Sequence, residues 1–158
     1  MMRLKRIGWI LFLFGASLWG APFTDNGNGT VTDSFTGLLW QKCSNGQNND
    51  TSCSGTATTS NWSNAITYCE GLVLGGRSDW RLPNVNDLRS IVDYTKSSAP
   101  TINTTAFPST FSTSGGPYWS SSTYAQDTNR AWGVSFQYGG VYNDAKTGNS
   151  YVRCVAGP

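Results

Sequence analysis

Aromatic, amide and charged side chains gather in one stretch of the C-terminal third, residues 124–144. Tyrosine rings present a flat apolar surface with a polar tip, and amide groups both donate and accept hydrogen bonds. This mixture suits contact with a glycan or a protein surface, whereas the chain has no histidine to act as a general base. We therefore predict a ligand-binding site without a catalytic residue. Its members are Tyr124, Asn129, Arg130, Tyr138, Tyr142, Asn143 and Asp144.

Cysteine is the other residue type that could carry chemistry, and the chain has four, at positions 43, 53, 69 and 154. An even number in an exported chain favours disulfides, and four cysteines can pair in three ways. We favour Cys43–Cys53, which would close a polar loop, and Cys69–Cys154, which would join an early helix to the last strand. A metal site or a reactive thiol pair is the alternative, but the spacings lack the close CxxC pairs of zinc sites.

The segment FTDNGNGTVTD, residues 23–33, has oxygen ligands for calcium in a glycine-rich setting, at Asp25, Asn28 and Asp33. However, glycines occupy positions at which an EF-hand loop needs ligands, and no glutamate closes the segment. Two Asn-Gly pairs between β-favouring residues are typical of a tight hairpin. We therefore predict a hairpin here and neither a metal nor another cofactor, with calcium as the alternative.

The N-terminus has the layout of a secretory signal peptide. Arg3, Lys5 and Arg6 precede an apolar run that is short for a transmembrane helix, and small residues follow it. We predict that residues 1–21 are this signal peptide and that residues 22–158 form one domain, with an uncleaved membrane anchor as the alternative. The protein would then be secreted, periplasmic or attached to the cell surface, without a membrane span in its mature form.

The charge balance argues against nucleic acid as a partner. The whole sequence carries 11 Lys and Arg against 9 Asp and Glu, and three of the basic residues lie in the predicted signal peptide. Binding to nucleic acid or to an anionic membrane surface normally requires a basic patch. The predicted partners are therefore a glycan or an extracellular protein, and a homo-oligomer is also possible.

Two helices should help to position these residues. The segment NWSNAITYCEGL, residues 61–72, has apolar residues at spacings of three and four behind Asn61, a favourable N-cap. In DWRLPNVNDLRSIVD, residues 79–93, Asn84 and Asp87 have the spacing of a capping box at the start of a second helix. The charged residues that we expect to form a structural ion-pair network beside it are Asp79, Arg81 and Arg89, with contact to a ligand as the alternative.

The last third of the chain changes to the period of a strand. The segments YWSSS, RAWGVSF, VYNDA and YVRCV favour β-structure and are separated by turn residues. Alternation in RAWGVSF places Trp132, Val134 and Phe136 on the inward side, and we expect Trp119 in the core as well. With the hairpin and the strand GLLWQ, this predicts an α+β fold in which two helices pack on antiparallel sheets and disulfides hold the parts together.

Many of these segments occur in the order found in one family. DNGNGTVTDSFTGLLWQ, AITYCEGL, DWRLPNVNDLRSIVDY, YWSSSTYA, AWGVSF and VRCV resemble bacterial surface domains related to the C-terminal domain of the Legionella collagen-like adhesin. The resemblance extends from about residue 23 to about residue 156, most of the chain. It implies a C-type-lectin-like fold, with two helices packed on twisted antiparallel sheets, which is also the fold of formylglycine-generating enzymes.

The resemblance also implies a function. It indicates a secreted or surface-exposed, non-catalytic binding module that recognises a glycan or a host or cell-surface protein, as an adhesin does. The adhesin relative is a trimeric binder of sulfated polysaccharide, but this chain lacks an excess of basic residues. Two alternatives are a structural subunit of an extracellular assembly and an oxidoreductase similar to the formylglycine-generating enzymes, which use a reactive cysteine pair.

Overall fold

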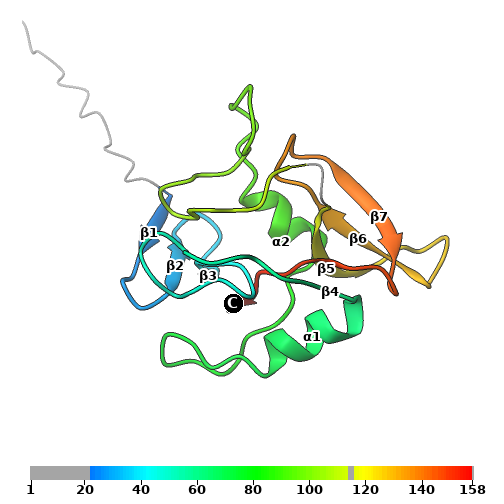
Figure 1. Cartoon of the computed structure of the whole chain (residues 1–158), viewed down its shortest axis with the longest axis horizontal. Helices are drawn as coiled ribbons and strands as arrows, with labels where there is room; N and C mark the ends of the chain where they lie inside the picture. Colours follow the sequence, from blue (N-terminus) through cyan, green and yellow to red (C-terminus); the bar gives the residue numbers. More distant parts are fainter. Residues whose placement is uncertain (1–21, 114–115, 158) are drawn as a thin grey trace, which may run out of the picture.

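The computed structural model describes residues 22–113 and 116–157, so the predicted signal peptide lies outside the described residues. This part of the chain forms two β-sheets and two helices (Figure 1). The first sheet, in the order β1-β2-β3-β9, consists of β1 (Phe23–Asp25), β2 (Thr30–Asp33), β3 (Leu39–Gln41) and β9 (Val155–Ala156). The second, in the order β4-β8-β5-β6-β7, consists of β4 (Thr59–Ser60), β5 (Tyr118–Thr123), β6 (Arg130–Val134), β7 (Val141–Ala145) and β8 (Ser150–Tyr151).

The predicted hairpin at the start of the domain is present. Strands β1 and β2 pair in antiparallel orientation, and the two Asn-Gly pairs lie in the turn between them. Gly27 and Gly29 have φ angles of 71° and 84°, in the left-handed region that glycine adopts most easily. Strand β3 follows with Trp40 fully buried, so the GLLWQ segment contributes to the core as expected.

The second sheet is mixed, whereas the sequence predicted antiparallel pairing alone. Strands β5, β6 and β7 form an antiparallel meander, but β8 lies on the other side of β5 and pairs with it in parallel, with Tyr118 opposite Tyr151. The segment YVRCV is also not one strand, because β8 ends at Tyr151 and β9 begins at Val155. The end of the chain thus passes from the second sheet to the first. Alternation of apolar and polar residues indicates where strands lie but not which strands become neighbours in a sheet. The parallel β5–β8 pair could therefore not be predicted from it.

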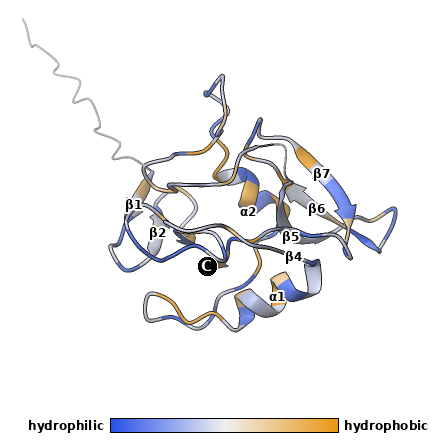
Figure 2. Cartoon of the chain, viewed as in Figure 1, coloured by the Kyte–Doolittle hydropathy of each residue, from blue (hydrophilic) through white to orange (hydrophobic). Residues whose placement is uncertain are grey.

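Both predicted helices form where their caps indicate. Helix α1 (Trp62–Glu70) begins after Asn61, whose side chain accepts a backbone hydrogen bond from the first turn. Helix α2 (Val85–Ser90) begins after Asn84, which forms the predicted capping box with Asp87. Apolar and polar segments alternate along both helices in Figure 2, as expected of helices with one buried face. No helix in the described part of the chain is both long and apolar enough to cross a membrane.

The helices cover opposite faces of the second sheet. Tyr118 and Trp119 are neighbours on β5, so their side chains point to opposite faces. Tyr118 belongs to the core cluster that contains Leu88 of α2, and Trp119 to the cluster that contains Ala65 of α1. Strand β7 has no buried residue and lies at the outer edge of the sheet (Figure 1). Its side chains are therefore available to solvent.

Both favoured disulfides are present. Cys43–Cys53 closes the loop between β3 and β4, and Cys69–Cys154 joins α1 to the segment before β9. The second bond spans 85 residues. In the chain-entropy model, a loop of that length contributes about 4 to 5 kcal/mol to the free energy of unfolding. This disulfide fastens helix α1, which packs on the second sheet, to the residue that precedes the last strand of the first sheet.

Arg153 is a fully buried cation between β8 and β9. Its guanidinium carbon lies 4.8 Å from the ring centroid of Phe107 and 5.5 Å from that of Tyr118. Its Nη2 donates to Ser44 Oγ and Thr110 Oγ1, at 3.3 and 3.0 Å, and no carboxylate pairs with it in the described residues. Burial therefore lowers the pKa of Arg153. The side chain holds three separate loops together.

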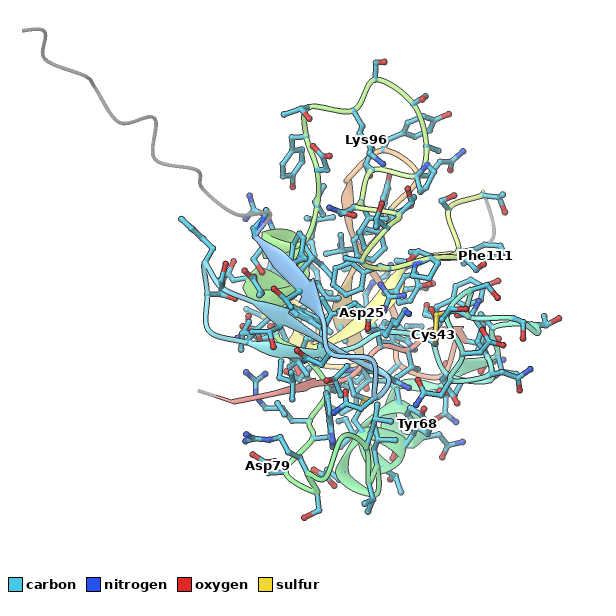
Figure 3. All side chains as sticks on the ribbon, turned by 90° about the vertical axis from the view of Figure 1, so that its left-hand side faces the viewer. Asp25, Cys43, Tyr68, Asp79, Lys96 and Phe111 are labelled. Carbon is cyan, nitrogen blue, oxygen red and sulfur yellow. A yellow bond between two sulfur atoms is a disulfide. The ribbon has the colours of Figure 1, made fainter. Side chains whose placement is uncertain are left out.

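The predicted ion-pair network of Asp79, Arg81 and Arg89 does not form. Asp79 pairs with Arg77, and Arg81 pairs with Asp87 at 2.7 Å. Arg89 has no ion pair among the residues that the structure describes. The partners are local, because Arg77 precedes Asp79 by two residues and the capping carboxylate of Asp87 lies close to Arg81. Figure 3 shows Asp79 at one end of the molecule.

Candidate functional site

The predicted ligand-binding residues are divided between two faces of the β6–β7 hairpin. The two strands pair without a register shift, and Trp132 lies opposite Asn143. Directly opposed residues share a face, and successive residues on a strand alternate between faces. Asn143 therefore shares one face with Trp132, while Tyr142 and Asp144 lie on the other. Tyr138 belongs to neither face, because it lies in the turn between the strands.

On the face of Trp132, the predicted residues bind one another. Arg130 donates from Nε to Asn143 Oδ1 and from Nη2 to Asn143 O, at 2.5 and 2.7 Å. Tyr124 packs edge-on against Trp132, with ring centroids 5.0 Å apart. Asn129 bonds to an aspartate within the β5–β6 turn. Much of the hydrogen-bonding capacity of this group is therefore used inside the protein.

Trp132 is only half-buried, so its predicted place in the core was wrong. Val134, Phe136 and Trp119 are buried as predicted. Trp132 lies opposite Asn143 of the outer strand, and beyond β7 there is no further strand to extend the core. The alternation along RAWGVSF predicted on which side of the sheet Trp132 lies, but it could not predict that its strand lies next to the outer strand of the sheet.

The hydrogen bonds at the two ends of the hairpin show which groups of β7 face outward. Lys146 N donates to Asn129 O, and Ser135 N donates to Gly140 O. In an antiparallel pair, every second residue bonds to the partner strand and the residues between direct their N–H and C=O groups away from it. The residues of β7 whose backbone groups point to the free edge are therefore Val141, Asn143 and Ala145.

Two side chains cover part of this free edge. The outward carbonyl of Asn143 accepts a hydrogen bond from the Arg130 guanidinium. The outward N–H of Ala145 donates to Asp144 Oδ1 at 2.7 Å. An exposed edge strand is a template for pairing with another chain, and charged side chains on it oppose such pairing. Arg130 and Asp144 thus cover part of an edge, a role that the sequence did not indicate.

Three exposed tyrosines surround the β6–β7 turn. The exposed fractions are 70% for Tyr138, 62% for Tyr94 and 53% for Tyr142. Two glycines make room for the rings: a Cβ on Gly139 would lie 2.9 Å from Tyr94 Cε1, and one on Gly140 would lie 2.8 Å from Tyr142 Oη. We call Tyr94, Tyr138 and Tyr142 the tyrosine patch. Because side chains at these two positions would collide with the rings of Tyr94 and Tyr142, the tyrosine patch requires glycines in the turn.

A shallow pocket of about 270 Å³ adjoins Tyr142. Among the described residues, no carboxylate, ammonium or guanidinium lines it, and its polar groups are hydroxyls and an amide. Ligand sites commonly combine an apolar or aromatic wall with a few such polar groups. The residues that line the pocket are Thr113, Gly116, Pro117, Ser135, Gln137 and Tyr142.

Sequence reasoning missed Tyr94 and most of the pocket. Tyr94 follows α2 and reaches the β6–β7 turn, where its Oη donates to Gly139 O at 3.4 Å. The two residues are 45 positions apart, so no local pattern connects them. The two adjacent glycines after Tyr138 were the available signal, since they mark a place where rings can approach the backbone.

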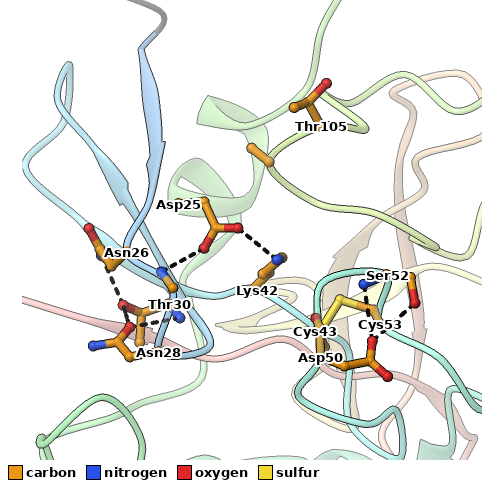
Figure 4. A network of polar contacts seen from close by, with 12 residues as sticks. Asp25, Asn26, Asn28, Thr30, Lys42, Cys43, Asp50, Ser52, Cys53 and Thr105 are labelled. Atoms are coloured by element: carbon orange, nitrogen blue, oxygen red, sulfur yellow. Dashed lines mark hydrogen bonds and ion pairs between the residues drawn. A yellow bond between two sulfur atoms is a disulfide. The ribbon is translucent and has the colours of Figure 1, made fainter.

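The calcium alternative at the first hairpin is not supported by the contacts there. Asp25 Oδ2 lies 2.7 Å from Nζ of Lys42, a nearly buried cation (Figure 4). Lys42, with the N–H of Gly27, lowers the pKa of Asp25, so a protein cation already compensates this carboxylate. Asn28 accepts from its own turn, and Asp33 accepts from the following turn. Within the described residues, no three His, Cys, Asp or Glu side chains gather as metal ligands do.

Asp50 orders the loop that Cys43–Cys53 closes. Its carboxylate accepts hydrogen bonds from the hydroxyl and N–H of Ser54 and from the N–H and hydroxyl of Ser52. These bonds lower the pKa of Asp50 to about 2. Figure 4 shows Asp50 and Ser52 beside the disulfide.

Cysteine chemistry is not offered by this fold. The chain has four cysteines and all of them are in disulfides, so there is no free thiol. Their residues are buried as well. Two disulfides are consistent with a domain that works in an oxidising compartment, either the periplasm or the extracellular space.

Comparison with known proteins gives one family. The family model described as the Lcl C-terminal domain matches residues 29–156. No curated protein shows a significant match to the chain.

Proposed function

The chain belongs to the Lcl C-terminal domain family, and we propose that it is a secreted or surface-exposed, non-catalytic binding module for a neutral glycan. The two disulfides support a location outside the cytoplasm. For the fold we propose the C-type-lectin-like class, which the two helices, two sheets and two disulfides would suit. The ligand would be recognised in the manner of an adhesin.

The observation that carries this proposal is the tyrosine patch beside an uncharged pocket. Tyr138 and Tyr142 are exposed, and Tyr142 is held against Gly140, so its ring loses little conformational freedom when a ligand covers it. Rigid aromatic rings are frequent binding anchors, and tyrosine brings a hydroxyl as well. Gln137 and the neighbouring hydroxyls of the pocket supply the directional hydrogen bonds that a sugar requires.

The remaining predicted residues would support the site rather than touch the ligand. Arg130 and Asn143 bind each other, and Asp144 binds the backbone of β7. In this proposal they keep β7 in place, so that Tyr142 stays at the wall of the pocket. Tyr124 and Asn129, which are engaged at the other end of the hairpin, would have the same supporting role.

The charge of the site favours a neutral glycan over a sulfated one. Sulfate groups call for arginine or lysine side chains with free donors. The described residues that line the pocket include neither, and Arg130, at the opposite end of the β6–β7 hairpin, bonds to Asn143. An oxidoreductase similar to the formylglycine-generating enzymes would need a reactive cysteine pair, which both disulfides argue against. The alternative of a structural subunit would use the tyrosine patch for contacts between copies.

A glycan array with the purified, oxidised protein tests this proposal. We expect binding to neutral glycans that is unchanged by a calcium chelator and lowered at least tenfold by Tyr142→Ala or Tyr138→Ala. Phe35→Ala is the matched control, because Phe35 is also an exposed aromatic residue but lies on the other sheet.

Three results would contradict the proposal. The first is a folded protein that binds no glycan, and the second is binding that Tyr142→Ala and Tyr138→Ala leave intact. The third is binding only to sulfated glycans that falls steeply with salt, which would show that charge rather than the tyrosine patch selects the ligand. Sedimentation velocity would identify a structural subunit, since a self-assembling protein would form oligomers that Tyr142→Ala disrupts.

A further inference from the structure

Strand β1 is the outer strand of the first sheet, and its free edge carries unused backbone groups. Ser34 N donates to Pro22 O, and Asn26 N donates to Thr30 O, which fixes the phase of the β1–β2 pair. By the alternation of an antiparallel ladder, Phe23 and Asp25 then direct their N–H and C=O groups away from β2. In the part of the chain that the structure describes, no group bonds to them.

Two clefts flank this edge. The larger, of about 460 Å³, lies between the start of β1, the β2–β3 turn and the end of α2. The smaller, of about 220 Å³, lies between β1 and residues 103–106. Phe23 and Asn103 line both clefts, so the clefts are neighbours along β1. Figure 4 shows Thr105 across from Asp25, where the smaller cleft lies.

The larger cleft has a rigid aromatic rim. Phe35 is 86% exposed, although it lies in a turn that is tightly held. The buried carboxylate of Asp33 accepts from the N–H of Phe35 at 2.9 Å and from the hydroxyl of Thr36 at 2.6 Å. An exposed ring on a preorganised turn is the type of residue that anchors protein partners.

The accessible charge at the larger cleft is negative. Asp93 lines it, and its Oδ1 accepts from the N–H and hydroxyl of Thr95, whereas Oδ2 has no partner among the described residues. Asp33, which also lines the cleft, is buried and bonded to its own turn. The nearby ammonium of Lys96 donates to Ile102 O at 2.6 Å. A basic side chain could extend its stem along the apolar walls and place its charge between Phe35 and Asp93.

We propose that the β1 edge binds an extended peptide segment of another protein by strand addition, with a basic side chain of that segment in the larger cleft. The outward backbone groups of Phe23 and Asp25 would pair with the peptide backbone. Side chains on one face of an extended peptide recur every second residue, about 7 Å apart. Alternate side chains of the peptide would therefore enter the two clefts, as in other complexes formed by strand addition.

This site shares no residue with the tyrosine patch or its pocket, although Asp93 directly precedes Tyr94 in the chain. The two proposals can therefore fail independently. The ladder is short, since β1 has 3 residues. We expect an affinity in the micromolar range, which is typical of small or transient interfaces.

Selection of random linear peptides displayed on phage, with the purified, oxidised protein as target, tests the proposal. The Phe35→Ala, Asp93→Asn double variant serves as the counter-target. We expect the enriched peptides to have β-favouring residues around a lysine or arginine. A synthetic copy of an enriched peptide should lose at least tenfold in affinity for either single variant and less than twofold for Tyr138→Ala.

A second measurement identifies the binding mode. In the peptide complex, hydrogen exchange at the amides of Phe23 and Asp25 should slow at least tenfold, because these groups become part of a ladder. The proposal is overturned if no peptide is enriched over the counter-target or if the enriched peptides bind the Phe35→Ala variant equally well. Unchanged exchange at Phe23 and Asp25 would likewise exclude strand addition. Dimerisation of the free protein through β1 would show that the occupant is a second copy instead.

Discussion

The outer strands β7 and β1 end the two sheets in different ways. At β7, Arg130 and Asp144 bond to backbone groups that would otherwise face solvent. At β1, the outward groups of Phe23 and Asp25 have no partner within the described residues, and clefts lie beside them. The protein thus protects one edge with its own side chains and leaves the other accessible.

The outer strand β9 strengthens this contrast. Its edge is covered by Arg81, because Arg81 N donates to Val155 O and Val155 N donates to Arg81 O. Open edges promote aggregation, so proteins commonly block them. Because the edges of β7 and β9 are covered at least in part, the open edge of β1 supports the binding role that we propose for it.

The largest effect that we expect comes from the disulfide that holds the first sheet against α1. Replacing Cys69 and Cys154 by serine should lower the free energy of unfolding by about 4 to 5 kcal/mol, because an 85-residue loop is released. The matched double replacement of Cys43 and Cys53, which releases a span of 10 residues, should cost about 3 kcal/mol. Urea unfolding of both variants measures the difference. Equal losses or the reverse order would contradict this account of the fold.

A smaller effect should follow from opening the edge of β7. The double variant Arg130→Ala, Asp144→Ala frees the carbonyl of Asn143 and the N–H of Ala145. We expect it to self-associate at least tenfold more strongly than the unmodified protein in sedimentation velocity experiments. The control is Arg77→Ala, Asp79→Ala, which removes the same two types of charge from an exposed ion pair away from the sheet edges. If the control associates equally, loss of charge rather than loss of edge protection is the cause.

The ion pair that holds β1 should make stability depend on pH to a smaller extent. The pKa of Asp25 is lowered by Lys42, so the native state favours the ionised carboxylate. Its contribution is present above the pKa of the unfolded chain, about 4, and is lost as pH falls through the lower native value. We expect about 1 kcal/mol or less, because Asp25 is partly exposed. Urea unfolding at pH 6 and pH 2 should show a smaller difference for Asp25→Asn than for the unmodified protein.

The smallest effect is expected in the loop of Asp50, which is distant from β7. The pKa of this carboxylate is about 2, so protonation should release Ser54 and Ser52 only near that pH. The amide signals of these serines should shift with a midpoint near pH 2 in an NMR titration. A midpoint near 4, the ordinary value for aspartate, would mean that the carboxylate does not order the loop.

The features predicted correctly from the sequence are those with local or covalent signals. Asn61 marked the start of α1, and Asn84 with Asp87 marked that of α2, because caps act on backbone groups a few residues away. Of the three possible disulfide pairings, the favoured one is present, with a short polar loop closed by Cys43–Cys53 and an early helix joined to the end of the chain by Cys69–Cys154. The Asn-Gly pairs gave the first hairpin for the same local reason.

The features that the sequence did not reveal depend on which segments become neighbours. The parallel contact of β8 with β5, the exposure of Trp132 and the approach of Tyr94 to Gly139 all join residues or strands that are distant in sequence or near a sheet edge. The protection of the β7 edge could not be predicted from the sequence either. Arg130 bonds to the outward carbonyl of Asn143 only because no further strand lies beyond β7 in the sheet. The residue types correctly drew attention to the β6–β7 hairpin. The division of these residues between its two faces, however, depends on the pairing register of β6 and β7, which the sequence does not reveal.

Residue-resolved hydrogen exchange of the free protein tests the contrast between the two edges most directly. We predict near-unprotected rates at the amides of Phe23 and Asp25 and at least tenfold slower exchange at Thr24, which faces β2. The amide of Ala145 should also be protected, and Asp144→Ala should remove that protection. Phe23 and Asp25 amides as protected as that of Thr24 would contradict the account, because the β1 edge would then already be occupied.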